Sequence, residues 1–279
     1  MRRLIINADD LGINPSRDHG IFETVERGVV TSASLLVNMG DSDRAAELAR
    51  RMELSTGLHF NLTEGFPLSP QKNIGSLLSA EGVFLNRKRM RQALNDGAVD
   101  PRHVAWEFRA QMEWFIAHRK DRPTHVDSHH NLHVHPLLVP VLAPLLAQYA
   151  VRWTRITDEP PPADHIDLDE ERRAFIAMMV EQARAARPLY EAHGVQSTDH
   201  FRGFGLAGNA SKKAFRQLVR TIPEGATELM VHPGQCAPDG SDPFSSDPQR
   251  ETEREMLTDE EMPAFLDQQK IALCSYADL

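Results

Sequence analysis

Short apolar runs alternate along the chain with segments whose apolar residues recur at helical spacing. Near the start, an apolar run at 4–8 precedes a stretch at 17–28 whose apolar residues share one helix face. A β-branched run at 29–37, an amphipathic stretch at 41–52 and a run at 56–62 continue the rhythm. Strands that alternate with helices in this way predict a parallel sheet covered by helices.

Residues 63–100 interrupt this rhythm, since they are rich in Gly, Pro, Ser and Asn and hold one short helical pattern at 74–78. A long irregular segment after a strand is typical of a substrate loop. The later pattern predicts helices at 101–119, 137–149, 168–193 (kinked or ended near Pro188), 210–221 and 251–269, strands at 124–128, 151–156, 226–232 and 271–275, and a Gly-rich turn at 199–208.

No linker or internal repeat divides the chain, so residues 1–279 are interpreted as one domain. The alternation favours an α/β fold of the (β/α) barrel-like type with seven or eight units. In such a fold the carboxyl ends of the strands carry the chemistry.

Composition narrows the class of protein. Apolar residues make up 41% of the chain and charged residues 25%, as in an ordinary globular protein. A formal charge of -9 argues against nucleic acid or an anionic membrane as a partner. Two cysteines outside a CxxC pair do not make a disulfide scaffold, and no signal or membrane-spanning segment is visible. We expect a cytoplasmic protein; the oligomeric state is left open, a homodimer included.

The polar residues that could do chemistry follow the expected strands. They are Asp9 and Asp10 after the first, His59 and Asn61 at the third, Asp127, His129 and His130 at the fourth, and His232 after a late strand. In a parallel sheet these ends converge on one edge. One carboxylate and two imidazoles form a common open ligand set for a divalent metal, which activates water for hydrolysis. A second carboxylate nearby can take the proton.

The segment HVDSHHNLHVHP at 125–136 holds five histidines. Buried imidazoles each need hydrogen-bond partners, so a purely structural core role is unfavourable, whereas an exposed loop would tolerate them. Not all five can bind one metal, and some are expected to orient others. Taken singly, Asp9-Asp10 could be a strand-to-helix turn, His59 a core histidine and His232 a turn cap.

Four motifs, in the order INADDLG, GLHFNLTEG, THVDSHHNLHVHP and ELMVHPG, resemble those of the YdjC-like carbohydrate deacetylases. They spread from residue 6 to residue 234, so the resemblance covers most of the chain. It implies a barrel-like fold akin to the polysaccharide deacetylases. It also implies a hydrolase that removes acetyl groups from N-acetylated sugars such as chito-oligosaccharides.

The resemblance also implies roles for individual residues. It implies a divalent metal, magnesium or zinc by family habit, bound by Asp10, His59 and His129, with Asp9 as general base and His232 as general acid. Orienting or substrate-contacting roles then fall to His125, Asp127, His130 and Arg202. The division between Asp9 and Asp10 rests on analogy with the wider superfamily, and the reverse division is the alternative. Where the family often has a third consecutive histidine, this chain has Asn131, which leaves His129 and His130 as ligands.

Two other classes of function compete with this interpretation. A single-metal amidohydrolase or phosphoesterase on a similar barrel would favour more ligands or a bridging lysine, and no lysine lies at an expected strand end. A non-catalytic sugar-binding or metal-binding protein would not explain why Asp10, His59 and His232 all follow strands. A glycosidase would need two opposed carboxylates, which Asp9-Asp10 does not offer. The Pro-rich stretch 158–169 matches no family motif.

Overall fold

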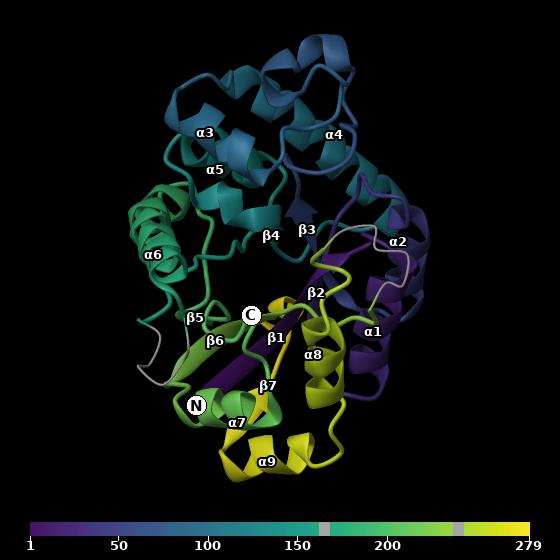
Figure 1. Ribbon diagram of the computed structural model, residues 1–279, viewed down its shortest axis with the longest axis vertical. Helices are drawn as coiled ribbons and strands as arrows, with labels where there is room; N and C mark the ends of the chain where they lie inside the picture. The colour runs from purple at the N-terminus through teal and green to yellow at the C-terminus, as the bar shows by residue number, and fades with distance from the viewer. Residues whose placement is uncertain (162–167, 237–242) are drawn as a thin grey trace.

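A curved sheet of parallel strands forms a half-barrel with helices around it in the computed structural model (Figure 1). The structure describes residues 1–161, 168–236 and 243–279. Within them the sheet order is β4, β3, β2, β1, β6, β5, and β7 pairs with β1. The strands are β1 (Arg2–Leu11), β2 (Ser32–Leu35), β3 (Ser55–Phe60), β4 (Val126–Ser128), β5 (His200–Arg202), β6 (Gly225–Val231) and β7 (Ile271–Leu273).

Helices surround the sheet, and side chains cap the first turns of α1, α3, α4, α6 and α7. Asn14 accepts a hydrogen bond from Arg17 N at the start of α1, and Asp100 accepts one from Arg102 N at the start of α4. The helices are α1 (Pro15–Glu26), α2 (Ser42–Arg51), α3 (Arg87–Asn95), α4 (Pro101–Arg119), α5 (Val139–Gln148), α6 (Glu170–Glu191), α7 (Lys212–Arg220), α8 (Gln249–Leu257) and α9 (Met262–Gln268). None of the described helices combines the length and the apolar character needed to cross a membrane.

The first strand forms the centre of the sheet. Leu4, Ile5 and Ile6 are fully buried, as expected for a parallel strand covered on both faces. β1 pairs with β6 along seven residues and with β2 near its carboxyl end. The carboxyl ends of β1, β3, β4 and β6 consequently reach the same edge of the sheet.

The barrel-like α/β class is confirmed, and most expected elements appear close to their expected places. The helix expected at 101–119 is α4 itself, whereas the stretch expected as a helix at 251–269 forms two helices, α8 and α9, with Pro263 in the first turn of α9. Pro188 neither ends nor splits α6, which continues to Glu191. The turn expected at 199–208 contains the short strand β5.

Two expectations were wrong. The segment expected as a strand at 151–156 makes only single bridges, at Trp153 and Thr154, because no continuous partner runs beside it. Inside the irregular region 63–100 the chain forms α3, which buries Met90 and Leu94 one turn apart. Residues 162–167 of the Pro-rich stretch lie outside the described residues.

Candidate active site

A cavity of about 710 Å³ opens at the carboxyl edge of the sheet. Its floor holds polar side chains from several strands, namely Asp9, Asp10, His59, His129, His130 and His232. Its rim adds Glu64, charged residues of α3 and α6, and the aromatic rings Phe175, Phe204 and Phe244. Residues that lie far apart in the sequence thus share one polar site.

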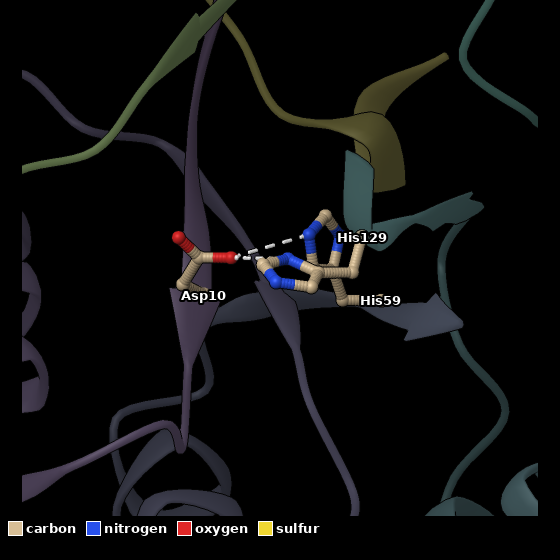
Figure 2. Close-up of side chains that lie close together, drawn as sticks. All are labelled: Asp10, His59 and His129. Atoms are coloured by element: carbon tan, nitrogen blue, oxygen red, sulfur yellow. Dashed lines mark ion pairs between the residues drawn. The ribbon is translucent and has the colours of Figure 1, made fainter. Parts of the chain in front are cut away.

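Three of these side chains form a candidate cation site. Asp10 from β1, His59 from β3 and His129 from the segment after β4 point toward one another (Figure 2). Asp10 Oδ1 lies 2.9 Å from His129 Nδ1 and 3.4 Å from His59 Nε2. Their candidate ligand atoms all lie within 4.8 Å of one another, and the three residues are buried.

An irregularity at the end of β1 lets adjacent aspartates serve the same cavity. Side chains of consecutive strand residues normally point to opposite faces. The register of β1 against β2 shifts between Ala8 and Leu11, and Asp10 takes a left-handed backbone with φ 68°. That conformation is unfavourable for an L-residue, so tertiary contacts must hold it. Arg17 Nη1, which donates to Asp10 Oδ2 at 3.1 Å, provides one such contact.

The donor set fits a divalent cation. Asp10 Oδ1 and His129 Nε2 are buried, and neither makes a well-directed hydrogen bond to a described residue, although they lie 2.9 Å from His129 Nδ1 and 3.4 Å from Glu64 Oε1, respectively. Burial disfavours charge on His59, yet the Asp127 and Asp9 carboxylates raise its pKa to about 10. Burial likewise opposes charge on His129, but Asp10 raises its pKa to about 9. The site therefore attracts positive charge, and His59 Nδ1, 2.7 Å from Asp127 Oδ1, leaves Nε2 directed toward Asp10.

The fully buried Arg155 holds Asp9, the aspartate outside the candidate cation site. Arg155 Nη1 and Nη2 donate to the two oxygens of Asp9 at 2.7 and 2.6 Å. The same guanidinium contacts Asp127 Oδ2 at 2.9 Å and donates from Nε to Glu228 Oε1 at 2.8 Å. Burial opposes its charge, but the three carboxylates raise the pKa of Arg155 well above its usual range. Asp9 is thus held by a fork of charge-assisted hydrogen bonds.

His232 lines the same cavity as the cation site, beside Asp9. Its Nε2 is 3.9 Å from Asp9 Oδ2, and the Phe244 ring meets the imidazole edge-on at 5.2 Å. Burial lowers the pKa of His232 to about 4, so the resting imidazole is neutral near pH 7. A neutral ring beside a carboxylate is well placed to receive a proton and pass it on.

The other predicted residues lie at different depths. His125 and Asp127 are buried beneath the cavity, where Ser34 Oγ lies 3.1 Å from His125 Nε2 and donates to Asp127 Oδ2 at 2.8 Å. His130 lines the cavity and contacts Thr63 Oγ1 through Nδ1 at 2.9 Å. Arg202 does not line the cavity and donates to the main-chain oxygen of Phe201.

Comparison with known proteins places this site in a family. The family model described as YdjC-like protein matches residues 3–268. The chain belongs to the YdjC-like family. This confirms the family predicted from the four motifs.

Three relatives that the chain matches over most of their length share one functional description. Proteins of this family from mouse, human and Geobacillus stearothermophilus, each called carbohydrate deacetylase, are 40%, 38% and 30% identical to the chain. Each alignment covers 99% of this chain and 94%, 91% and 98% of the respective relative. A crystal structure from Enterococcus faecalis, described as a candidate cellobiose-phosphate cleavage protein, has a TM-score of 0.81 and 26% identity. That alignment covers 99% of this chain and 98% of the other.

The YdjC-like site contains residues that sequence reasoning missed. Arg155 carried one weak signal, a charged residue inside an expected strand, which it shares with Arg152. Glu64, whose Oε1 lies 3.4 Å from His129 Nε2, stood inside the quoted motif GLHFNLTEG without being assigned a role. For Arg17 and Glu228 no local pattern distinguishes a partner of the site from an ordinary charged residue.

Proposed function

We propose that this protein is a divalent-cation-dependent carbohydrate deacetylase that removes acetyl groups from N-acetylated sugars such as chito-oligosaccharides. The observation that carries the proposal is one cavity in which Asp10, His59 and His129 converge beside Asp9 and His232. Family membership and the descriptions of the relatives support it.

Asp10, His59 and His129 would hold the cation, with magnesium or zinc as the expected ion. When bound, such an ion supplies a Lewis acid that polarises an amide carbonyl and lowers the pKa of water. Asp127 orients His59 through its contact with Nδ1, and Arg17 holds the outer oxygen of Asp10.

Asp9 is the proposed proton acceptor. Arg155 donates to both Asp9 oxygens and Asn7 Nδ2 donates to Oδ1 at 2.9 Å, so a lone pair on Oδ2 remains to accept a proton from water. As the water oxygen attacks the acetyl carbon, Asp9 takes the proton, and a tetrahedral oxyanion forms on the substrate.

His232 is the proposed proton donor to the leaving nitrogen. Because its resting ring is neutral, it must first receive a proton, and Asp9 lies 3.9 Å away. The proton removed from water then passes through Asp9 and His232 to the nitrogen as the carbon–nitrogen bond breaks. The first products are the free amine and acetic acid, and the acid then ionises to acetate, so no outside proton donor is needed.

The region 63–100 is the proposed substrate loop. It contributes Glu64, Asn86, Arg87 and Lys88 to the lining of the cavity. Side chains at this rim would contact parts of the sugar away from the acetyl group.

The test is acetate release from a panel of N-acetylated mono- and oligosaccharides, with and without a chelator. We expect release from at least one sugar, loss of release with the chelator, and recovery on adding magnesium or zinc. A phosphomonoester and a cyclic amide serve as controls for the rival hydrolases. Turnover of a control substrate with no acetate from any sugar would overturn the proposal.

A further inference from the structure

A buried chain of hydrogen bonds continues from Arg155 away from the cavity. Glu228 on β6 accepts from Arg155 Nε through Oε1 at 2.8 Å, and its Oε2 accepts from the Tyr276 hydroxyl at 2.7 Å. Tyr276 belongs to a 3-10 turn, Tyr276–Asp278. The side chains of Arg155, Glu228 and Tyr276 are all buried. Neither Glu228 nor Tyr276 lines the cavity.

The Glu228 carboxylate determines which edge of the guanidinium faces Asp9. Glu228 Oε1 accepts from Nε and also lies 2.7 Å from Nη2, so it holds the Nε–Nη2 edge, while the end formed by Nη1 and Nη2 faces Asp9. Nη2 also lies 2.9 Å from Asp127, the residue that contacts His59. One guanidinium therefore connects the proposed base with the carboxylate that orients a proposed ligand.

Tyr276 completes the partners of Glu228. An ionised carboxylate away from water needs donors on both oxygens, and a missing donor is costly. Arg155 supplies the donor to one oxygen and the Tyr276 hydroxyl supplies the donor to the other. Without the hydroxyl, Glu228 would retain only the Arg155 contact and would hold the guanidinium less firmly.

The Tyr276 ring is itself immobilised. His125 stacks on it with ring centroids 3.8 Å apart and an interplanar angle of 17°. The turn that carries Tyr276 is closed by reciprocal hydrogen bonds between Ser275 and Asp278. Because both the ring and the turn are held, the Tyr276 hydroxyl donates to Glu228 in one fixed geometry.

We propose that Glu228 and Tyr276 are positioning residues of the reaction, which keep Arg155 aligned so that Asp9 is held for proton transfer. The inference rests on the proposed deacetylase function. It predicts an effect on turnover from side chains that do not reach the substrate or the cation site.

The test compares Tyr276→Phe with Tyr190→Phe. Tyr190 is equally buried, and its hydroxyl donates to the main-chain oxygen of His133 at 2.8 Å, so its variant loses a buried tyrosine hydroxyl without touching Glu228. For Tyr276→Phe we expect kcat to fall about tenfold with KM and cation affinity unchanged. For Tyr190→Phe we expect kcat within about twofold of the parent at a similar loss of Tm.

Glu228→Gln is the second variant, which keeps the side-chain shape but removes the charge that faces Arg155, and it should lower kcat at least as far. All rates refer to folded, cation-loaded enzyme, quantified by circular dichroism and metal analysis. A kcat for Tyr276→Phe equal to that of Tyr190→Phe would overturn the inference, as would a loss confined to KM or to cation affinity.

A crystal structure of Tyr276→Phe gives a readout that needs no turnover. We expect the fork from Arg155 to Asp9 to be displaced, and an unchanged fork would contradict the inference. A parent enzyme that releases no acetate would defeat the proposed function instead. A parent that releases acetate at the same rate as Tyr276→Phe would defeat only the positioning role.

Discussion

Two adjacent aspartates have separate surroundings, which is the basis for assigning them separate roles. Asp10 Oδ1 lies 2.9 and 3.4 Å from two imidazoles, and Arg17 contacts only its outer oxygen. Arg155 instead holds both oxygens of Asp9, and Asp9 Oδ2 lies no nearer than 3.9 Å to His59 or His232. The left-handed backbone at Asp10 makes this possible, because a regular strand would turn one of the two away from the cavity. A substitution of Asp9 should therefore lower turnover, whereas a substitution of Asp10 should weaken cation binding.

Asp9→Asn is expected to lower kcat by about 10²- to 10⁴-fold while cation affinity stays close to that of the parent. The amide keeps the size of the side chain but takes up a proton poorly. The measurement is acetate-release kinetics together with isothermal titration of magnesium and zinc. Thermal unfolding is followed in parallel, because Asp9 also neutralises buried Arg155.

Asp10→Asn is the matched control and should weaken cation binding first. The opposite pattern, with cation binding lost at Asp9 and retained at Asp10, would reverse the two assignments.

At the scale of elements, Gly57 on β3 leaves room for the ring of His125, which directly precedes β4. A Cβ added at Gly57 would lie 2.4 to 2.6 Å from atoms of the His125 ring. His125 in turn stacks on Tyr276 and contacts Ser34. The absence of a side chain at Gly57 thus leaves room for the His125 ring to stack on Tyr276.

Gly57→Ala is accordingly expected to destabilise the protein by about 1–3 kcal/mol, because the His125 ring must shift within a packed interior. Urea unfolding monitored by circular dichroism measures the change. Gly40→Ala is the control, since a Cβ there meets nothing within 4 Å. Equal stability of the two variants would show that the interior around His125 accommodates the added methyl group.

The elements also show which parts of the fold and the site sequence reasoning could reach. Local periodicity located β1 and α4, and parallel strand ends led to Asp10, His59 and His129 at one edge, although their ligand roles stay predictions. Periodicity failed at 151–156, where strand pairing depends on distant partners rather than on the local sequence. Arg155, Glu228 and Tyr276 could not be linked from sequence, because their contacts span long separations and follow no spacing rule.

At the scale of the whole molecule, the interior contains histidines that acid should convert into unfavourable charges. Burial lowers the pKa of His125 to about 4 and that of His133 to about 4. His133 donates from Nε2 to Arg155 O and accepts the Ser128 hydroxyl at Nδ1, so its neutral form is the one that fits. In the unfolded chain both would titrate near pH 6.5.

The stabilisation from each neutral histidine is complete above pH 6.5 and is lost as the pH falls toward 4, because only the unfolded state takes up the proton there. Between pH 7 and pH 5 the loss should be about 2 kcal/mol per histidine. Urea unfolding with a chelator present measures it. The raised pKa values of His59 and His129 act in the opposite sense around pH 6.5, because both rings are already protonated in the folded state while the unfolded rings still titrate there. Their contribution becomes constant only well below pH 6.5.

His133→Gln should show a smaller loss than the parent over the same interval. The difference between the two proteins is the informative quantity, because Asp18, whose pKa burial raises, titrates in the opposite sense. An identical pH dependence of the free energy of unfolding in variant and parent would show that His133 does not contribute to the loss.

The central place of β1 has a consequence for synthesis of the chain. β1 ends at Leu11, but its partner β6 spans residues 225–231 and β7 spans 271–273. At about 5–20 residues per second, β1 leaves the ribosome on the order of 10–40 s before β6 is made. During that interval one edge of an apolar strand has no native partner, and such an edge is a template for pairing between chains. Nascent chains that stop before residue 225 should therefore be the species that most needs protection from aggregation.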